Sequence, residues 1–169
     1  ENTIKVDNTK KVYDYAELLD DNQETLLYNE IGKYIEQFDM DMVVVTINNN
    51  NKSSSMAYAD DFYDYNNFGV GDKNSGILFL IDMDNRKMWI STTGDAINVY
   101  TDSIIDDILD SSYTYISSAK YYQCTQAFIE SASEYANKYR VKYEEKHSVF
   151  GISKSSAIFA CIITGIYVC

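Results

Sequence analysis

Three aspartates stand where the chain is expected to pass between helices and strands: Asp14, Asp72 and Asp102. In an open α/β sheet, loops at one edge converge on a shared crevice, so carboxylates from three loops can meet there. Hard cations need several oxygen ligands and negative charge. The pattern therefore predicts a metal site, and Ca²⁺ is expected there in preference to Mg²⁺. The alternative is separate structural roles, with Asp14 in a turn and Asp102 as a helix cap.

A second acidic pair, Asp82 and Asp84, follows an apolar run. The pair is similar to the D-x-D sequence of haloacid-dehalogenase phosphatases, where one aspartate is a nucleophile and the other an acid or base. That pattern continues with Thr or Val and a long α/β domain, whereas here Arg86 follows and a hairpin closes directly. A polar turn is therefore the preferred interpretation. The segment also lacks the central glycine and terminal glutamate of an EF-hand loop.

The positions of the histidine and the cysteines do not favour catalysis by these residues. His147 is the one histidine, and it lies in the basic stretch near the C-terminal end. This position disfavours Ser/His/Asp and Cys/His catalysis. The three cysteines, Cys124, Cys161 and Cys169, form no C-x-x-C pair and no disulfide framework.

The charge balance is strongly acidic. Lys and Arg total 14 against 26 Asp and Glu, a net charge of −12. A nucleic-acid partner is not expected, because phosphate neutralisation needs a basic face. Residues 138–154 reverse the sign, with five Lys or Arg against Glu144 and Glu145. This reversal predicts a boundary near the C-terminal end of the globular part.

Apolar periodicity predicts alternating helices and strands. Continuous β-branched runs suit strands that are buried on both faces. Either Asp20 or Asp21 is expected to cap the first helix, and Asp21-x-x-Glu24 has the form of a capping box. The next helix is expected to turn Met56, Ala59 and Tyr63 inward. The expected helices cover about 27–38, 55–66, 101–116 and 119–143, and the expected strands cover 42–47, 77–81 and 87–91, the last two as a hairpin.

The two ends of the chain differ from its middle. Residues 1–11 are polar and are expected to form an extended lead-in to an α/β domain over 12–143. Residues 144–155 are expected to be a juxtamembrane linker. Residues 156–169 are apolar but shorter than the roughly 20 residues of a spanning helix. They are interpreted as the start of a truncated transmembrane helix, and the alternative is a buried core helix.

Several segments, in order, resemble the TPM domain family. Residues 12–19 are similar to its V-x-D-x-A-x-x-L opening, and residues 69–80 to its G-x-G-x-K-x-x-N-G-x-L-x-L segment. Residues 85–87 resemble its D-R-K turn, and Thr101-Asp102 resembles the start of its next helix. One departure is that residues 94–97 lack the glutamate of the family's G-x-G-L-E segment.

The resemblance implies a three-layer α/β/α sandwich with a small, mostly parallel sheet and one antiparallel hairpin. It also implies an extracytoplasmic domain held at the cell membrane, since family members lie between a signal peptide and a membrane helix. Some members bind calcium, and a plant member is described as an acid phosphatase. The expected function is a calcium-binding module in envelope or complex upkeep, with a protein partner in the envelope. The alternative is a weak metal-dependent acid phosphatase.

Overall fold

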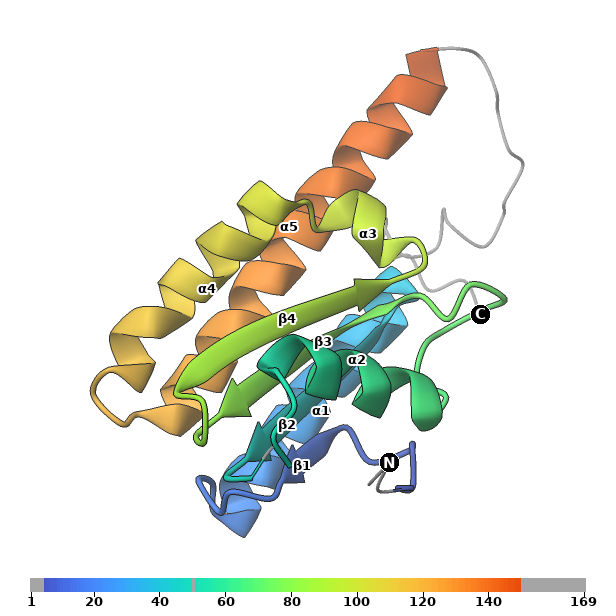
Figure 1. The fold of residues 1–169 in the computed structure, drawn as a ribbon. Coiled ribbons are helices and arrows are strands. Elements are labelled where there is room, and N and C mark those ends of the chain that lie inside the picture. Colours follow the sequence, from blue (N-terminus) through green and yellow to red (C-terminus); the bar gives the residue numbers. More distant parts are fainter. Residues whose placement is uncertain (1–4, 50, 150–169) are drawn as a thin grey trace, which may run out of the picture. The chain divides into compact units, whose positions relative to one another are not determined.

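Two continuous apolar runs form the centre of the sheet in the computed structural model, which describes residues 5–49 and 51–149. Within these residues the chain forms four strands and five helices (Figure 1). In chain order they are β1 (Val12–Asp14), α1 (Asp21–Phe38), β2 (Asp41–Ile47), α2 (Ser55–Tyr65), β3 (Gly76–Asp82), β4 (Lys87–Thr93), α3 (Ala96–Val99), α4 (Asp102–Ile116) and α5 (Tyr121–Val149).

The strands form one sheet in the order β1-β2-β3-β4. The first three are parallel, and β4 pairs antiparallel with β3. Every residue of β2 and β3 is buried, as expected for central strands covered on both faces. The parallel sheet and the single antiparallel hairpin agree with the fold class predicted from the sequence.

Helices cover both faces of the sheet. One face packs against α1, α3, α4 and α5, with Leu27, Phe79 and Phe128 among the buried side chains. The rings of Phe79 and Phe128 stack with centroids 4.5 Å apart. The opposite face packs against α2 and the loop after it, through Phe62 and Phe68. The molecule is therefore the expected α/β/α sandwich, with unequal helix layers (Figure 1).

Some local predictions were wrong. The sequence-based reading had no strand at β1 and no helix at α3. The capping box of α1 uses Asp20 with Gln23 rather than Asp21 with Glu24, because Asp20 keeps an extended backbone and accepts from the Gln23 N–H. Met56 is 50% exposed instead of inward, while Ala59 and Tyr63 are buried as expected.

Helix α5 forms the C-terminal part of the described chain. The compact unit that contains the sheet ends at Asn137, and a second unit begins at Lys138. Helix α5 continues to Val149, so the first residues of the expected linker, from Glu144, are helical. The expected membrane segment, 156–169, lies outside the described residues. Among the helices that the structure describes, none is long and apolar enough to span a bilayer.

Candidate functional site

The carboxyl ends of the three parallel strands share one edge of the sheet, here called the carboxyl edge. Asp14, the last residue of β1, lies opposite Thr46 of β2. Asp82, the last residue of β3, lies opposite Ile47. In open α/β sheets this edge is where ligands usually bind. Two acidic positions singled out from the sequence therefore lie in the expected region.

Asp14 holds the turn between β1 and α1. Its Oδ2 accepts a hydrogen bond of 2.8 Å from the Leu19 N–H, and its Oδ1 accepts a short one from the Thr46 hydroxyl. The same hydroxyl accepts from the Ala16 N–H at 3.1 Å. These bonds join the strand end to the residues that lead into the helix. Asp14 thus has the turn role that was the alternative to a metal ligand.

A pocket of about 310 Å³ opens beside Asp14. Two further carboxylates, Asp7 and Glu24, line it together with Lys10 and the rings of Tyr13 and Tyr15. Lys10 Nζ lies 3.4 Å from a Glu24 carboxylate oxygen. Hydrogen bonds from the Thr9 hydroxyl and N–H lower the pKa of Asp7 by stabilising its charged form. Asp14 therefore shares a pocket with Asp7 and Glu24, neither of which was predicted from the sequence to be a site residue.

Asp82 is buried and fully engaged in local structure. Its Oδ2 accepts 2.8 Å and 3.0 Å hydrogen bonds from the Ser55 hydroxyl and the Asn85 side-chain amide. Its Oδ1 accepts a 3.0 Å bond from the Asn85 N–H. Ser55 is the first residue of α2, so the carboxylate also lies at a helix N-terminus, where negative charge is favoured. The polar-turn interpretation of Asp82 and Asp84 fits this geometry.

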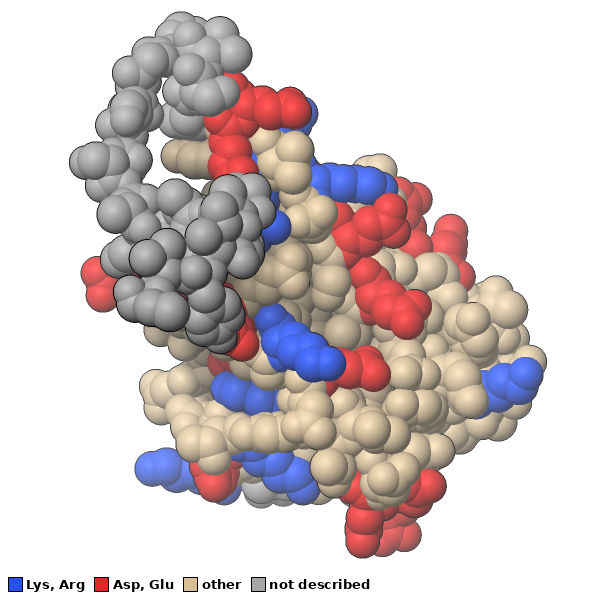
Figure 2. Space-filling view, turned by 180° about the vertical axis from the view of Figure 1, so that it is seen from behind, with Lys and Arg blue, Asp and Glu red and all other residues tan. Residues whose placement is uncertain are grey.

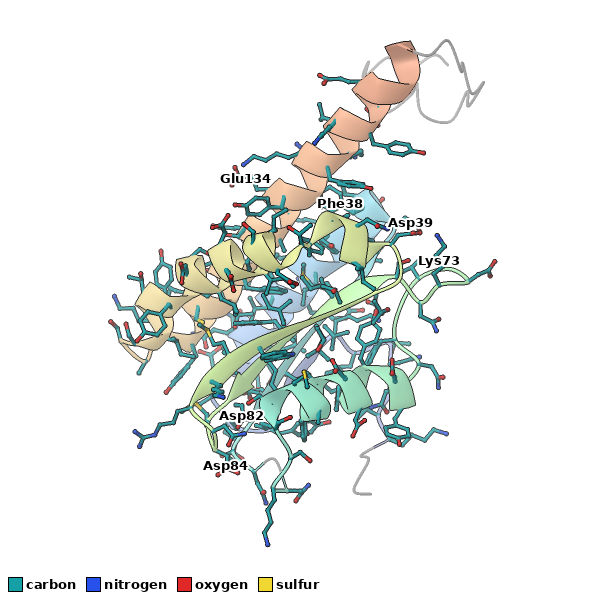
Figure 3. The ribbon with its side chains drawn as sticks, turned by 45° about the horizontal axis from the view of Figure 1, so that its top comes forward. Phe38, Asp39, Lys73, Asp82, Asp84 and Glu134 are labelled. Atoms are coloured by element: carbon teal, nitrogen blue, oxygen red, sulfur yellow. The ribbon has the colours of Figure 1, made fainter. Side chains whose placement is uncertain are left out.

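Asp72 and Asp102 lie toward the opposite edge of the sheet. Asp72 is exposed in the loop that precedes β3, and Asp102 opens α4 after β4 has ended beside the start of β3. The length of β3 separates this edge from the carboxyl edge by about 20 Å. Figure 3 shows the separation, with Asp82 and Asp84 at one end of the sheet and Lys73, the neighbour of Asp72, at the other.

The structure therefore does not bring Asp14, Asp72 and Asp102 together. In residues 5–49 and 51–149, no three His, Cys, Asp or Glu side chains are arranged to hold a metal ion. Asp102 is in the first turn of α4, whose N-cap is Thr101, so it supports the helix without being its cap residue. Whether the protein binds calcium stays a prediction.

A buried carboxylate at the opposite edge was missed from the sequence. Asp41, at the start of β2, forms an ion pair of 2.9 Å with Lys11 and accepts a 2.9 Å bond from the Gly69 N–H. Gly69 has a φ of +112°, and a Cβ there would collide with the backbone of Asn74. Asp41 thus connects Lys11 to the glycine-rich loop before β3. The sequence signal for this role is an aspartate that stands directly before an apolar run.

Charge is spread over the surface rather than gathered at one site. In the space-filling view of one face, acidic side chains form several separate areas with lysine and arginine side chains between them (Figure 2). An isolated acidic crevice of the kind predicted from the three loop aspartates is not seen on that face.

This mixed sheet, with helices on both faces and polar side chains at its carboxyl edge, defines an α/β sandwich domain. The TPM domain family matches residues 12–135 of the chain. The protein belongs to that family, as the resemblance predicted. No curated protein sequence matched the chain.

Solved structures with the same fold include three bacterial proteins. The N-terminal domain of a P. gingivalis protein aligns with a TM-score of 0.70 and 17% identity, over 82% of this chain and 94% of that one. The N-terminal domain of the cg2496 protein of Corynebacterium glutamicum aligns with a TM-score of 0.61 and 14% identity, over 79% of this chain and 88% of that one. The BA42 protein of Bizionia argentinensis aligns with a TM-score of 0.65 and 15% identity, over 73% of this chain and 84% of that one. At these identities the likeness concerns the fold alone.

Proposed function

We propose that this TPM domain is a ligand-binding module of a membrane-anchored protein, and that it lies outside the cytoplasm. The module acts through binding in envelope or complex upkeep and does not hydrolyse phosphomonoesters. The apolar segment 156–169, which follows a stretch of net positive charge, supports the anchor. The compact unit that contains the sheet ends at Asn137, before that segment begins.

The observation that supports a binding role over catalysis is the burial and hydrogen bonding of the Asp82 carboxylate. A nucleophilic carboxylate must reach a substrate, with an acid or base beside it. Asp82 is 1% exposed and accepts from a hydroxyl, a side-chain amide and a backbone N–H. Asp14 is likewise engaged by Leu19 and Thr46. These bonds support structural roles for both carboxylates at the carboxyl edge.

We further propose that Ca²⁺ binds in the pocket beside Asp14. Asp7, Glu24 and Asp14 line this pocket, but as they stand they are not arranged to hold an ion, so their side chains have to move together when calcium binds. Calcium accepts irregular sets of carboxylate and carbonyl oxygens. Lys10, which now pairs with Glu24, has to turn away as the ion enters. Asp72 and Asp102 do not line this pocket and are not part of the proposed calcium site.

A thermal melt with and without millimolar Ca²⁺ tests the cation site. Binding to the folded state alone raises the melting temperature by mass action. The rise is expected to shrink in Glu24→Gln and to persist in Asp72→Asn, an exposed carboxylate at the other edge. An equal rise in both variants, or no rise in the unaltered protein, contradicts the site.

A further inference from the structure

A pocket of about 450 Å³ lies at the end of the β3–β4 hairpin, away from the Asp14 pocket. The hairpin contributes Arg86 and Lys87, and the facing wall is formed where α4 ends and α5 begins, by Tyr113 and Tyr121. Figure 1 shows the hairpin beside the loop that joins these two helices. All of these residues belong to the compact unit that ends at Asn137.

The cationic side of this pocket is available to a ligand. Arg86 and Lys87 are both exposed. Neither forms an ion pair or a side-chain hydrogen bond with any residue that the structure describes. Asp82, which lies opposite Lys87 in the hairpin, takes its hydrogen bonds from Ser55 and Asn85 instead. In a chain of net charge −12, two unpaired cations at one hairpin favour an anionic group at this point.

The remaining wall is mainly apolar, and its polar members are Ser117 and Asp82, whose carboxylate is already bonded to Ser55 and Asn85. Met83 and Met88 are half-buried and, with Ile116, line the pocket. Methionine side chains are flexible and polarisable, and they are common on surfaces that accept varied peptide side chains. The ring of Tyr113 is 65% exposed at the rim. Exposed tyrosines beside an apolar floor are typical of protein-binding surfaces.

From this combination we infer that the hairpin pocket binds a peptide segment of a protein partner, in which a carboxylate stands next to a large apolar residue. The apolar side chain packs on Met83 and Met88, and the carboxylate pairs with Arg86 and Lys87. An arginine can hold a carboxylate through two parallel hydrogen bonds. The inference rests on the proposed binding function and names the chemistry of the partner.

The test uses the full chain and fluorescein-labelled hexapeptides in which Asp or Glu adjoins Leu, Met or Phe, measured by fluorescence polarisation. Saturable binding is expected for at least one acidic peptide, and not for the same peptide with Lys in place of the acid. The affinity is expected to fall by about tenfold or more in the double variant Arg86→Glu/Lys87→Glu, because like charges are then juxtaposed. It is also expected to fall in Tyr113→Ala.

Two matched variants control for net charge and exposed aromatic area. Lys5→Glu/Lys33→Glu changes the charge by the same amount away from the hairpin, and Tyr28→Ala removes a tyrosine that is 47% exposed on α1. Both should bind as the unaltered protein does, and melting curves verify that every variant is folded. Equal losses in test and control variants would overturn the inference. So would the absence of saturable binding by every peptide up to about 1 mM, a weak limit for specific recognition.

Inorganic phosphate serves as a competitor in the same assay. Displacement of the peptide by phosphate at concentrations equal to those of unlabelled peptide would show a simple anion site and contradict the peptide assignment. These outcomes are independent of phosphatase assays, so the inference can fail while the proposed function stands. Robust hydrolysis of a phosphomonoester would overturn the proposed function without affecting the peptide measurement.

Discussion

The Ser55 hydroxyl donates a 2.8 Å hydrogen bond to the buried carboxylate of Asp82, and this bond joins the start of α2 to the end of β3. The contact connects the single helix on one face of the sheet to a central strand. It places a charged group inside the fold, where each of its bonds supports the local geometry. The consequence is that Asp82 should matter for stability.

Replacement of Asp82 by Ala is expected to lower the free energy of unfolding by about 2–4 kcal/mol, because the Ser55 hydroxyl proton and the Asn85 N–H lose their carboxylate acceptor in a buried site. Urea denaturation measures the change. Asp72→Ala is the control, since that side chain is exposed and should change stability by less than about 0.5 kcal/mol. Equal effects of the two substitutions would show that Asp82 has no structural role.

A pair of buried tyrosines allows a sharper comparison. The hydroxyl of Tyr100 donates to the carbonyl of Ala132 at 2.9 Å, so the Tyr34 hydroxyl, 2.6 Å away, donates to Tyr100. Tyr100→Phe leaves the Tyr34 hydroxyl buried without a partner, at an expected cost of about 1–3 kcal/mol. Tyr34→Phe leaves the Tyr100 donor satisfied and should cost about 1 kcal/mol. Urea unfolding of both variants gives the order, and a larger loss in Tyr34→Phe would contradict the assigned direction.

Alkaline pH should destabilise the fold. Burial raises the pKa of Tyr58 to about 12 and raises those of Tyr34 and Tyr100 as well. Because an unfolded tyrosine ionises near pH ~10, the unfolded state binds fewer protons than the folded state above that pH, and stability falls as pH rises. Tyrosine absorbance and far-ultraviolet circular dichroism, followed together, check this. Ionisation of all tyrosines near pH ~10 with no loss of structure would be inconsistent with the buried hydroxyls.

Long apolar patterns explain why most of the fold could be predicted from the sequence. Strands β2 and β3 are continuous buried runs of seven residues, which signal a central parallel strand. Strand β1 has three residues, too few to show a period, and it forms because Val12 and Tyr13 pack beside β2. Its position as an edge strand is a property of the tertiary structure.

The site could be predicted only in part, because sequence order does not show at which end of a strand a loop lies. Asp14 is the last residue of β1, whereas Asp72 precedes β3, and in parallel strands those two positions fall at opposite edges. Asp102 comes after β4, which runs antiparallel and ends beside the start of β3, so Asp102 lies toward the same edge as Asp72. The partners of Asp14 in its pocket, Asp7 and Glu24, are brought there by the lead-in and by α1.

The most direct test of the proposed function is hydrolysis of p-nitrophenyl phosphate by the full chain, with and without Ca²⁺ or Mg²⁺, at acidic and neutral pH. The binding role predicts a rate equal to that of buffer under every condition, because Asp82 and Asp14 are engaged in structural hydrogen bonds. A folded Asp82→Asn preparation, verified by its melting curve, serves as the matched protein. Multiple turnovers by the unaltered protein that disappear in Asp82→Asn would contradict the account and identify the domain as a phosphatase.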